Sequence, residues 1–190
     1  MLNEIKEKAI LDSIPIMQDD GIDFLIDYIK KNNVKDILEI GTAVGYSSIK
    51  MALINDNINV VTIERDELRY NEAIENIKKM NLENRIKCVL GDALDISLDG
   101  SFDLIFIDGA KSQNIKFFEK YKNLLRKNGS ILVDNIYFHG VIYENDSNLS
   151  RNLRGIKRKI LGFIDYIKSL DDYEIDILSR GDGIAIIKHK

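Results

Sequence analysis

The sequence predicts an α/β fold with a mostly parallel sheet, helices on both faces and an antiparallel hairpin at the C-terminal end. Three observations support this prediction. Short apolar runs alternate with helical segments five times, as expected for a parallel sheet covered on both faces. A glycine turn joins the first run to a helix. The last two runs are separated by residues 180–183, Arg-Gly-Asp-Gly, a hairpin connection.

Size and composition fit one globular domain. The chain has 190 residues, of which 31% are charged and 45% hydrophobic. We therefore expect residues 1–190 to form a single domain, with residues 1–33 as an N-terminal helical cap. No apolar run approaches the roughly 20 residues of a membrane span, and the charged N-terminus is unlike a signal peptide. Cys88 is the only cysteine, which excludes an internal disulfide. We expect a cytoplasmic protein with no membrane partner.

The pattern of apolar residues gives the order of the elements. Pro15, the only proline, separates the first two helices, and Gly129 is expected to end the fifth. We expect helices at 2–11, 21–31, 46–53, 66–80, 114–127 and 149–170, and strands at 36–40, 59–63, 85–90, 102–107, 130–133, 173–178 and 184–188.

The glycine turn after the first strand indicates a ligand site. Strand, glycine turn and helix together aim backbone N–H groups at a nucleotide-like ligand. The spacing Glu39-x-Gly41-x-x-x-Gly45 differs from the G-x-G-x-x-G turn of dinucleotide folds. It resembles the first motif of class I S-adenosylmethionine (SAM) methyltransferases, in which the carboxylate faces the methionine part of the cofactor. The alternative is a glycine turn in some other α/β domain.

An acidic residue lies at the end of each of the first five predicted strands or in the turn after it. In an open α/β sheet, ligands bind beyond the carboxyl ends of the strands. Glu64 can accept hydrogen bonds from both ribose hydroxyls of a nucleoside, although an acid at a helix start also favours the helix dipole. Asp92 and Ala93 would then lie along the adenine edge. The full set is Glu39, Glu64, Asp92, Asp108, Asp134 and Asn135.

The fourth and fifth strands end in a set of oxygen ligands. Asp108, Asp134 and Asn135 offer two carboxylates and an amide oxygen, which suit a hard cation such as Mg²⁺. The alternative is that Asp134-Asn135 only makes a turn. Lys111 lies beside this set, where a nearby cation and partial desolvation lower the pKa of a lysine and allow it to act as a general base. His139 is the alternative base.

Several motifs together resemble one family. ILEIGTAVGYS, VVTIE, GDAL, FDLIFIDGAK and LVDN resemble the metal-dependent O-methyltransferases related to catechol and caffeoyl-CoA O-methyltransferases, which have a seven-stranded Rossmann-like sheet. The resemblance implies a homodimer, with Lys111 as the base that takes the proton. It implies that Asp108, Asp134 and Asn135 hold the metal. The residues expected at the cofactor are Met17, Glu39, Gly41, Ser47, Glu64, Asp92, Ala93 and Asp108.

Two features indicate the substrate. IPIM near the start and GDGIAI at the end resemble the bacterial tRNA 5-hydroxyuridine methyltransferases, which act at the wobble position. The helix at 149–170 lacks the substrate-contacting glutamate of catechol enzymes. Opposite its apolar stripe it carries Arg151, Arg154 and Arg158, which suit the phosphates of tRNA. The alternative for this basic face is simple solvation.

Other functions remain open at this point. A small-molecule catechol or hydroxycinnamoyl O-methyltransferase would use the same cofactor and metal residues. An N-methyltransferase acting on a nucleobase would carry a D/N-P-P-Y-like motif, whereas this chain has Asp108-Gly-Ala-Lys111. A SAM-binding protein without activity would not need Lys111, Asp134 and Asn135.

Overall fold

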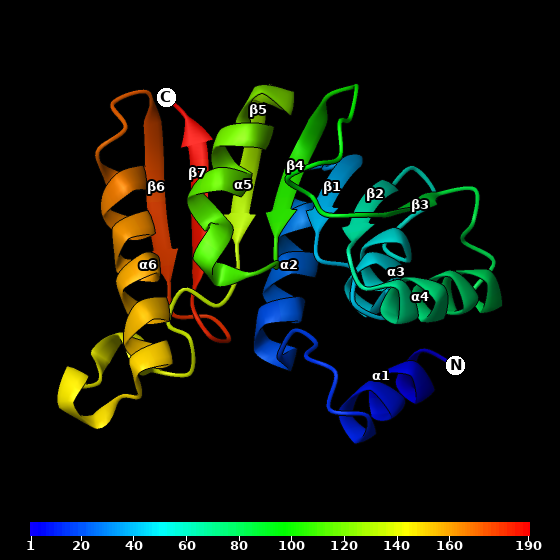
Figure 1. Ribbon diagram of the computed structural model, residues 1–190. Coiled ribbons are helices and arrows are strands. Elements are labelled where there is room, and N and C mark those ends of the chain that lie inside the picture. Colours follow the sequence, from blue (N-terminus) through cyan, green and yellow to red (C-terminus); the bar gives the residue numbers. More distant parts are fainter.

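The computed structural model describes residues 1–190 as a seven-stranded sheet with helices on both faces (Figure 1). The strands are β1 (Asp36–Ile40), β2 (Asn59–Glu64), β3 (Ile86–Leu90), β4 (Phe102–Ile107), β5 (Leu125–Val133), β6 (Tyr173–Leu178) and β7 (Ile184–His189). The helices are α1 (Leu2–Leu11), α2 (Asp19–Lys31), α3 (Tyr46–Ala52), α4 (Glu67–Lys79), α5 (Asn114–Tyr121) and α6 (Arg151–Lys168). Four 3₁₀ turns complete the chain: η1 (Lys111–Gln113), η2 (Lys122–Leu124), η3 (Val141–Tyr143) and η4 (Asp146–Asn148).

The strand order is β3-β2-β1-β4-β5-β7-β6. Strands β1 to β5 are parallel, whereas β7 lies antiparallel between β5 and β6. This arrangement confirms the predicted fold, including the terminal hairpin. No helix of the structure combines the length and the apolar character that crossing a membrane requires.

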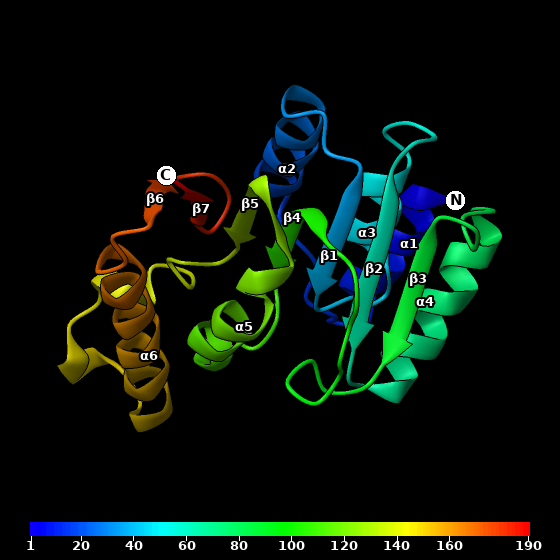
Figure 2. The ribbon, with the colours of Figure 1, turned by 90° about the horizontal axis from the view of Figure 1, so that it is seen from above.

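The two faces of the sheet bury separate apolar cores. Along β1, Ile37 packs into the core under α1, α2, α3 and α4, while Leu38 packs into the core under α5 and α6. Leu104 and Ile105 of β4 alternate in the same way, because successive side chains of a strand point to opposite faces. Figure 2 shows the sheet between these two groups of helices.

The prediction of a helix over 114–127 that stops at Gly129 is wrong. Helix α5 ends at Tyr121, and β5 already begins at Leu125, which pairs with Phe102 of β4. Gly129 lies buried within this strand, where a Cβ would sit 2.8 Å from the carbonyl oxygen of Asp103. The polar residues before Gly129 resemble a helix end, but strand pairing with a register shift decides the structure here. The other expected elements are present, some with slightly shifted ends.

Candidate active site

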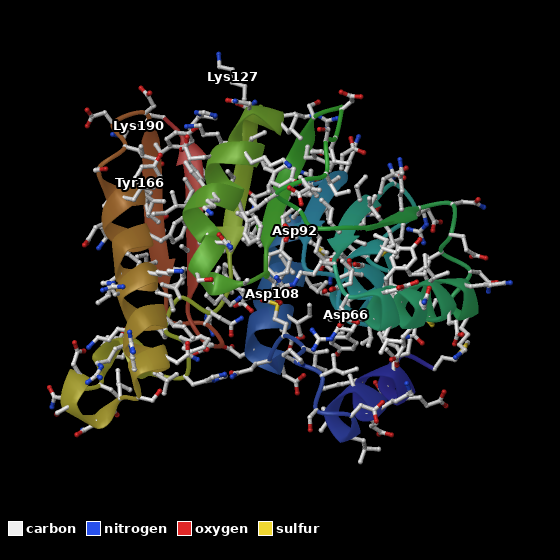
Figure 3. All side chains as sticks on the ribbon, in the orientation of Figure 1. Asp66, Asp92, Asp108, Lys127, Tyr166 and Lys190 are labelled. Atoms are coloured by element: carbon white, nitrogen blue, oxygen red, sulfur yellow. The ribbon has the colours of Figure 1, made fainter.

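The five parallel strands end at one edge of the sheet, the lower edge in Figure 1, and a cavity of about 630 Å³ opens there. Its walls come from the turns after β1, β2, β3 and β4, from the segment before α2, and from the loop after β5. Asp108, labelled in Figure 3, lies at this end of β4. The position agrees with the rule that places ligands beyond the carboxyl ends of the strands.

The glycine turn forms one wall of the cavity. Gly41 has a φ of +104°, and a Cβ at this position would lie 2.6 Å from the carbonyl oxygen of Asp108. Gly45 caps the N-terminus of α3 with a φ of +82°. Both positions favour glycine because residues with a side chain rarely adopt a backbone conformation with positive φ. The turn therefore brings backbone close to the end of β4 and leaves room for a ligand.

Glu39 lies beneath this turn and not on the wall of the large cavity. Its carboxylate is fully buried and accepts hydrogen bonds from Ser47 Oγ at 2.5 Å, from Thr62 Oγ1 at 2.6 Å and from the Ser48 hydroxyl. Burial raises the pKa of Glu39 to about 7, against the lowering effect of the three hydroxyl donors. The structure thus brings together Glu39 and Ser47, as a buried polar cluster that supports the turn.

Glu64 lies on the cavity wall at the end of β2. One carboxylate oxygen accepts from the Ala43 N–H at 2.8 Å, and the other accepts from the Asp66 N–H at 2.9 Å. The neighbouring Asp66 caps α4 by accepting from the Arg69 N–H at 3.0 Å. Because Asp66 performs the capping, the reading of Glu64 as a helix-start acid loses its support. Glu64 instead ties the glycine turn to the end of β2.

Asp92 and Ala93 follow β3 and line the same cavity. Asp92 Oδ1 accepts from the Leu94 N–H at 2.8 Å, which fixes the turn. The buried Tyr121 hydroxyl donates to the carbonyl oxygen of Ala93 at 2.6 Å. This hydrogen bond joins helix α5 to this wall of the cavity. The predicted cofactor residues Asp92 and Ala93 therefore lie together with Glu64.

Met17 lies in the N-terminal cap beside the glycine turn, in a pocket that the expected cofactor residues Gly41, Ser47 and Asp108 also line. Its side chain is buried and lies against Gly21, where an added Cβ would be 3.1 Å from the methionine methyl carbon. Met17 lines only a small pocket next to the glycine turn, which shares Pro15, Ile16, Gly41, Ala43 and Asp108 with the large cavity. The cap reaches the large cavity through Pro15, Ile16 and Gln18.

Asp108, Asp134 and Asn135 lie together at the ends of β4 and β5. The Asn135 side-chain amide donates to Asp108 Oδ1 at 3.2 Å and to Asp134 Oδ2 at 2.9 Å. Lys111 Nζ donates to Asp108 Oδ1 at 2.8 Å. Asn135 has a φ of +59°, a conformation that asparagine adopts more readily than most residues. The expected set and the candidate base are thus assembled at one point of the cavity edge.

This set concentrates negative charge in a buried place. Asp134 is 3% exposed. Burial, together with the nearby Asp108 carboxylate, raises the pKa of Asp134 well above its ordinary value. Lys111 is the only cation that donates to this set. The arrangement can therefore bind a further positive charge.

The three predicted phosphate-binding arginines lie on α6. Arg151, Arg154 and Arg158 are exposed, and the helix buries Ile160, Ile164 and Ile167 as expected. Arg154 donates to the carbonyl oxygen of Asp146 at 3.3 Å. The first turns of α6 lie at the lower edge of the sheet in Figure 1, and the helix packs against η1, which contains Lys111. The three arginines do not line the cavity.

Sequence reasoning missed several residues of the cavity wall. Arg65 comes from the turn between β2 and α4, Arg69 comes from the first turn of α4, and Phe117 comes from α5. Phe138 comes from the loop after β5, next to His139, which the sequence had already indicated as the alternative base. Arg65 directly follows the predicted strand-end acid, so its position contained a usable signal. Phe117 looked like an ordinary core residue of an amphipathic helix.

Comparisons with known proteins agree with this geometry. A family model described as O-methyltransferase matches residues 1–190. A solved structure from Staphylococcus aureus, provisionally described as a caffeoyl-CoA O-methyltransferase, is 36% identical with a TM-score of 0.95, and the match covers 100% of this chain and 92% of that one. The SAH-bound O-methyltransferase from Bacillus cereus is 28% identical with a TM-score of 0.85, over 100% and 90% of the two chains.

A curated relative gives the same result. Tapetum-specific methyltransferase 1 of Arabidopsis thaliana is 28% identical over 200 residues, which cover 99% of this chain and 85% of the relative. The family match spans the whole chain, and the cavity lies where the fold binds nucleoside ligands. The chain belongs to the O-methyltransferase family and is a SAM-dependent O-methyltransferase.

Proposed function

We propose that this protein methylates 5-hydroxyuridine at the wobble position of tRNA, using SAM and a hard divalent cation such as Mg²⁺. The observation that carries the proposal is the basic face at the start of α6. Arg151 and Arg158 are exposed and form no ion pair within the protein. Helix α6, which carries these cations, packs against η1, the turn that contains Lys111. Free guanidinium groups next to an active site suit the phosphates of a nucleic acid.

The strand-end residues fit the proposed cation. Asp108 and Asp134 share one amide donor, Asn135, so their oxygens already converge on a common region. The charges of the buried Asp134 carboxylate and the partly exposed Asp108 carboxylate repel each other, and a divalent cation between them would relieve this repulsion. Oxygen ligands of this kind suit Mg²⁺ better than zinc. When bound, such a cation would favour the deprotonated form of the acceptor hydroxyl.

The acceptor must fit this chemistry. The 5-hydroxyl and 4-carbonyl of 5-hydroxyuridine are two oxygens on adjacent carbons, as in a catechol. Lys111, whose Nζ donates to Asp108 Oδ1 at 2.8 Å, would remove the hydroxyl proton. The acceptor oxygen then attacks the methyl carbon of SAM, the bond between this carbon and sulfur breaks, and SAH leaves. The protein contributes alignment of these atoms in the cavity.

A second candidate is O-methylation of a small catechol-like molecule. The caffeoyl-CoA O-methyltransferase of Populus kitakamiensis is 28% identical over 192 residues, which favours this alternative. The basic face of α6 counts against it, because a free catechol has no phosphate for the arginines to bind. Caffeoyl-CoA does carry phosphates, so the assay must include it.

One assay separates the candidates. The protein is incubated with labelled SAM and Mg²⁺ and either tRNA containing 5-hydroxyuridine, the same tRNA with unmodified uridine, 3,4-dihydroxybenzoate or caffeoyl-CoA. The proposal predicts transfer to the hydroxyuridine tRNA alone, and loss of transfer when a chelator removes the cation. Efficient methylation of a small molecule with none of the tRNA would contradict it.

A charge-matched pair of variants tests the basic face. Replacing Arg154 and Arg158 by Ala is expected to raise the KM for tRNA and to reduce the salt slope of binding by roughly one unit per lost phosphate contact. The control replaces Lys127 and Lys168, two exposed cations away from the site. Lys127 lies at the opposite end of the sheet in Figure 3. Equal effects in both double variants would show that only overall charge matters.

A further inference from the structure

The loop after β5 adopts an unusual backbone conformation at the cavity. Phe138 and His139 both line the cavity. Their φ angles are +48° and +54°, and Asn135 is also left-handed. Residues other than glycine rarely adopt this backbone conformation, and it persists only where surrounding contacts enforce it. The contacts that hold this loop therefore determine the shape of the cavity beside Asp108 and Asn135.

Those contacts come from the β6–β7 hairpin. Both carboxylate oxygens of Asp182 accept from the His139 N–H, at 2.7 and 2.8 Å. The carbonyl oxygen of Asp182 accepts from the Tyr137 N–H at 2.8 Å. The carbonyl oxygen of Gly183 accepts from the Ile136 N–H at 2.9 Å. Asp182 is 8% exposed, so its carboxylate has little access to water.

The hairpin turn is in turn fixed to the N-terminal cap. The Gly181 N–H donates to Asp20 Oδ2 at 2.8 Å, and Arg180 pairs with Asp20 Oδ1 at 3.3 Å. A Cβ at Gly181 would lie 3.1 Å from the Cα of Gly21. The turn is thus anchored to the start of α2 on one side and to the cavity loop on the other. It has little freedom to move away from the loop.

We propose that Asp182 is a positioning residue for the methyl acceptor. It does not line the cavity, and it acts through the backbone N–H of His139, which sets the position of Phe138 and His139. A carboxylate suits this task because hydrogen bonds to a charged acceptor are stronger than those to a neutral one. The cofactor side of the cavity, with Gly41 and Glu64, shares no hydrogen bond with Asp182.

The proposal separates two properties that a general folding defect would change together. Loss of the Asp182 carboxylate is expected to loosen the acceptor side and to leave SAM binding intact. The proposed role of Asp182 rests on the methyltransferase activity of the family, and it holds whichever acceptor the protein uses. Amide hydrogen exchange of residues 136–140 measures the loop directly, without any acceptor.

The test compares Asp182→Ala, Asp182→Asn and the control Asp176→Asn. Asp176 is an exposed acid of the same hairpin. In Asp182→Ala, amide exchange at 136–140 should be faster. The acceptor for the kinetic measurement is the one that the wild-type protein methylates in the parallel tRNA and small-molecule assays. The kcat/KM of Asp182→Ala for this acceptor should fall roughly tenfold to a hundredfold. Asp182→Asn keeps one acceptor oxygen and should recover most of both properties. Asp176→Asn should match the wild type, and calorimetry should show SAM affinity unchanged within about twofold in all three.

The proposal would be overturned if Asp182→Ala kept both the wild-type exchange at 136–140 and the wild-type kcat/KM. It would also be overturned if Asp182→Ala lost SAM affinity to the same extent as turnover. If Asp182→Ala does not fold, Asp20→Ala is the second variant, because it releases the hairpin from α2 at an exposed position. It should raise exchange at 136–140 in the same direction. Unchanged exchange at 136–140 in Asp20→Ala would then overturn the proposal.

Discussion

Replacing Glu39 by Gln should change how the stability of the protein depends on pH. The Glu39 carboxylate is fully buried and is surrounded by the hydroxyls of Ser47, Ser48 and Thr62. Glutamine has nearly the same shape, and the hydroxyls can rotate to accept from its amide. The substitution therefore removes the ionisation and keeps most of the packing.

The sign and size of the effect follow from the pKa. Burial raises the pKa of Glu39 from 4.5 to about 7 in the folded protein. Between these values the folded state binds more protons than the unfolded state, so the free energy of unfolding falls as pH rises. The wild type should lose about 3 kcal/mol over this range. Above about pH 7 the contribution is constant, because both states are ionised.

Urea unfolding at about pH 5, 6, 7 and 8 measures this contribution. The free energy of unfolding of Glu39→Gln minus that of the wild type should increase from acid to neutral pH. The difference in melting temperature between Glu39→Gln and the wild type should therefore be several degrees more favourable to the variant at neutral pH than at acid pH. Glu83→Gln, the same substitution at an exposed acid, should give a flat difference. A flat difference for Glu39→Gln would refute the reasoning, because it would mean that the three hydroxyls offset the effect of burial on the pKa.

Three further predictions concern the cavity. Glu64→Ala should weaken the binding of both SAM and SAH in calorimetry by roughly tenfold or more, because it removes the charged acceptor that ties the glycine turn to β2. Asp134→Ala should abolish turnover with SAM affinity nearly unchanged, since Asp134 does not line the cavity; parallel loss of both would contradict this assignment. Lys111→Ala should lower the single-turnover rate roughly 100-fold or more, with partial rescue at high pH. An unchanged rate would transfer the role of base to His139 or to the cation alone.

The sequence was most informative where strands are buried on both faces. The runs at Asp36–Ile40 and Phe102–Ile107 are apolar and bounded by turn residues, so their limits were predicted correctly. Acids directly after parallel strands must share one edge of the sheet. For this reason Asp108, Asp134 and Asn135 could be predicted to lie together from their positions in the chain alone.

The parts that depend on tertiary contacts were not predictable. The start of β5 at Leu125 depends on pairing with Phe102, which a local pattern does not contain. The burial of Glu39 under hydroxyls follows from the pleat, because Leu38 and Ile40 both point to the face under α5 and α6. Glu39 must then point to the opposite face, where α3 begins. The contact between Asp182 and His139 joins residues 43 positions apart, and no local sequence pattern in either segment indicates it.

The most direct test of the account is a crystal structure with SAH and Mn²⁺, in which anomalous scattering locates the metal. We expect SAH in the cavity against Glu64 and an anomalous peak bonded to oxygens of Asp108, Asp134 and Asn135. We also expect this peak to disappear in Asp134→Ala while SAH remains. SAH bound in the cavity with no peak at these three residues, or with a peak elsewhere, would contradict the account.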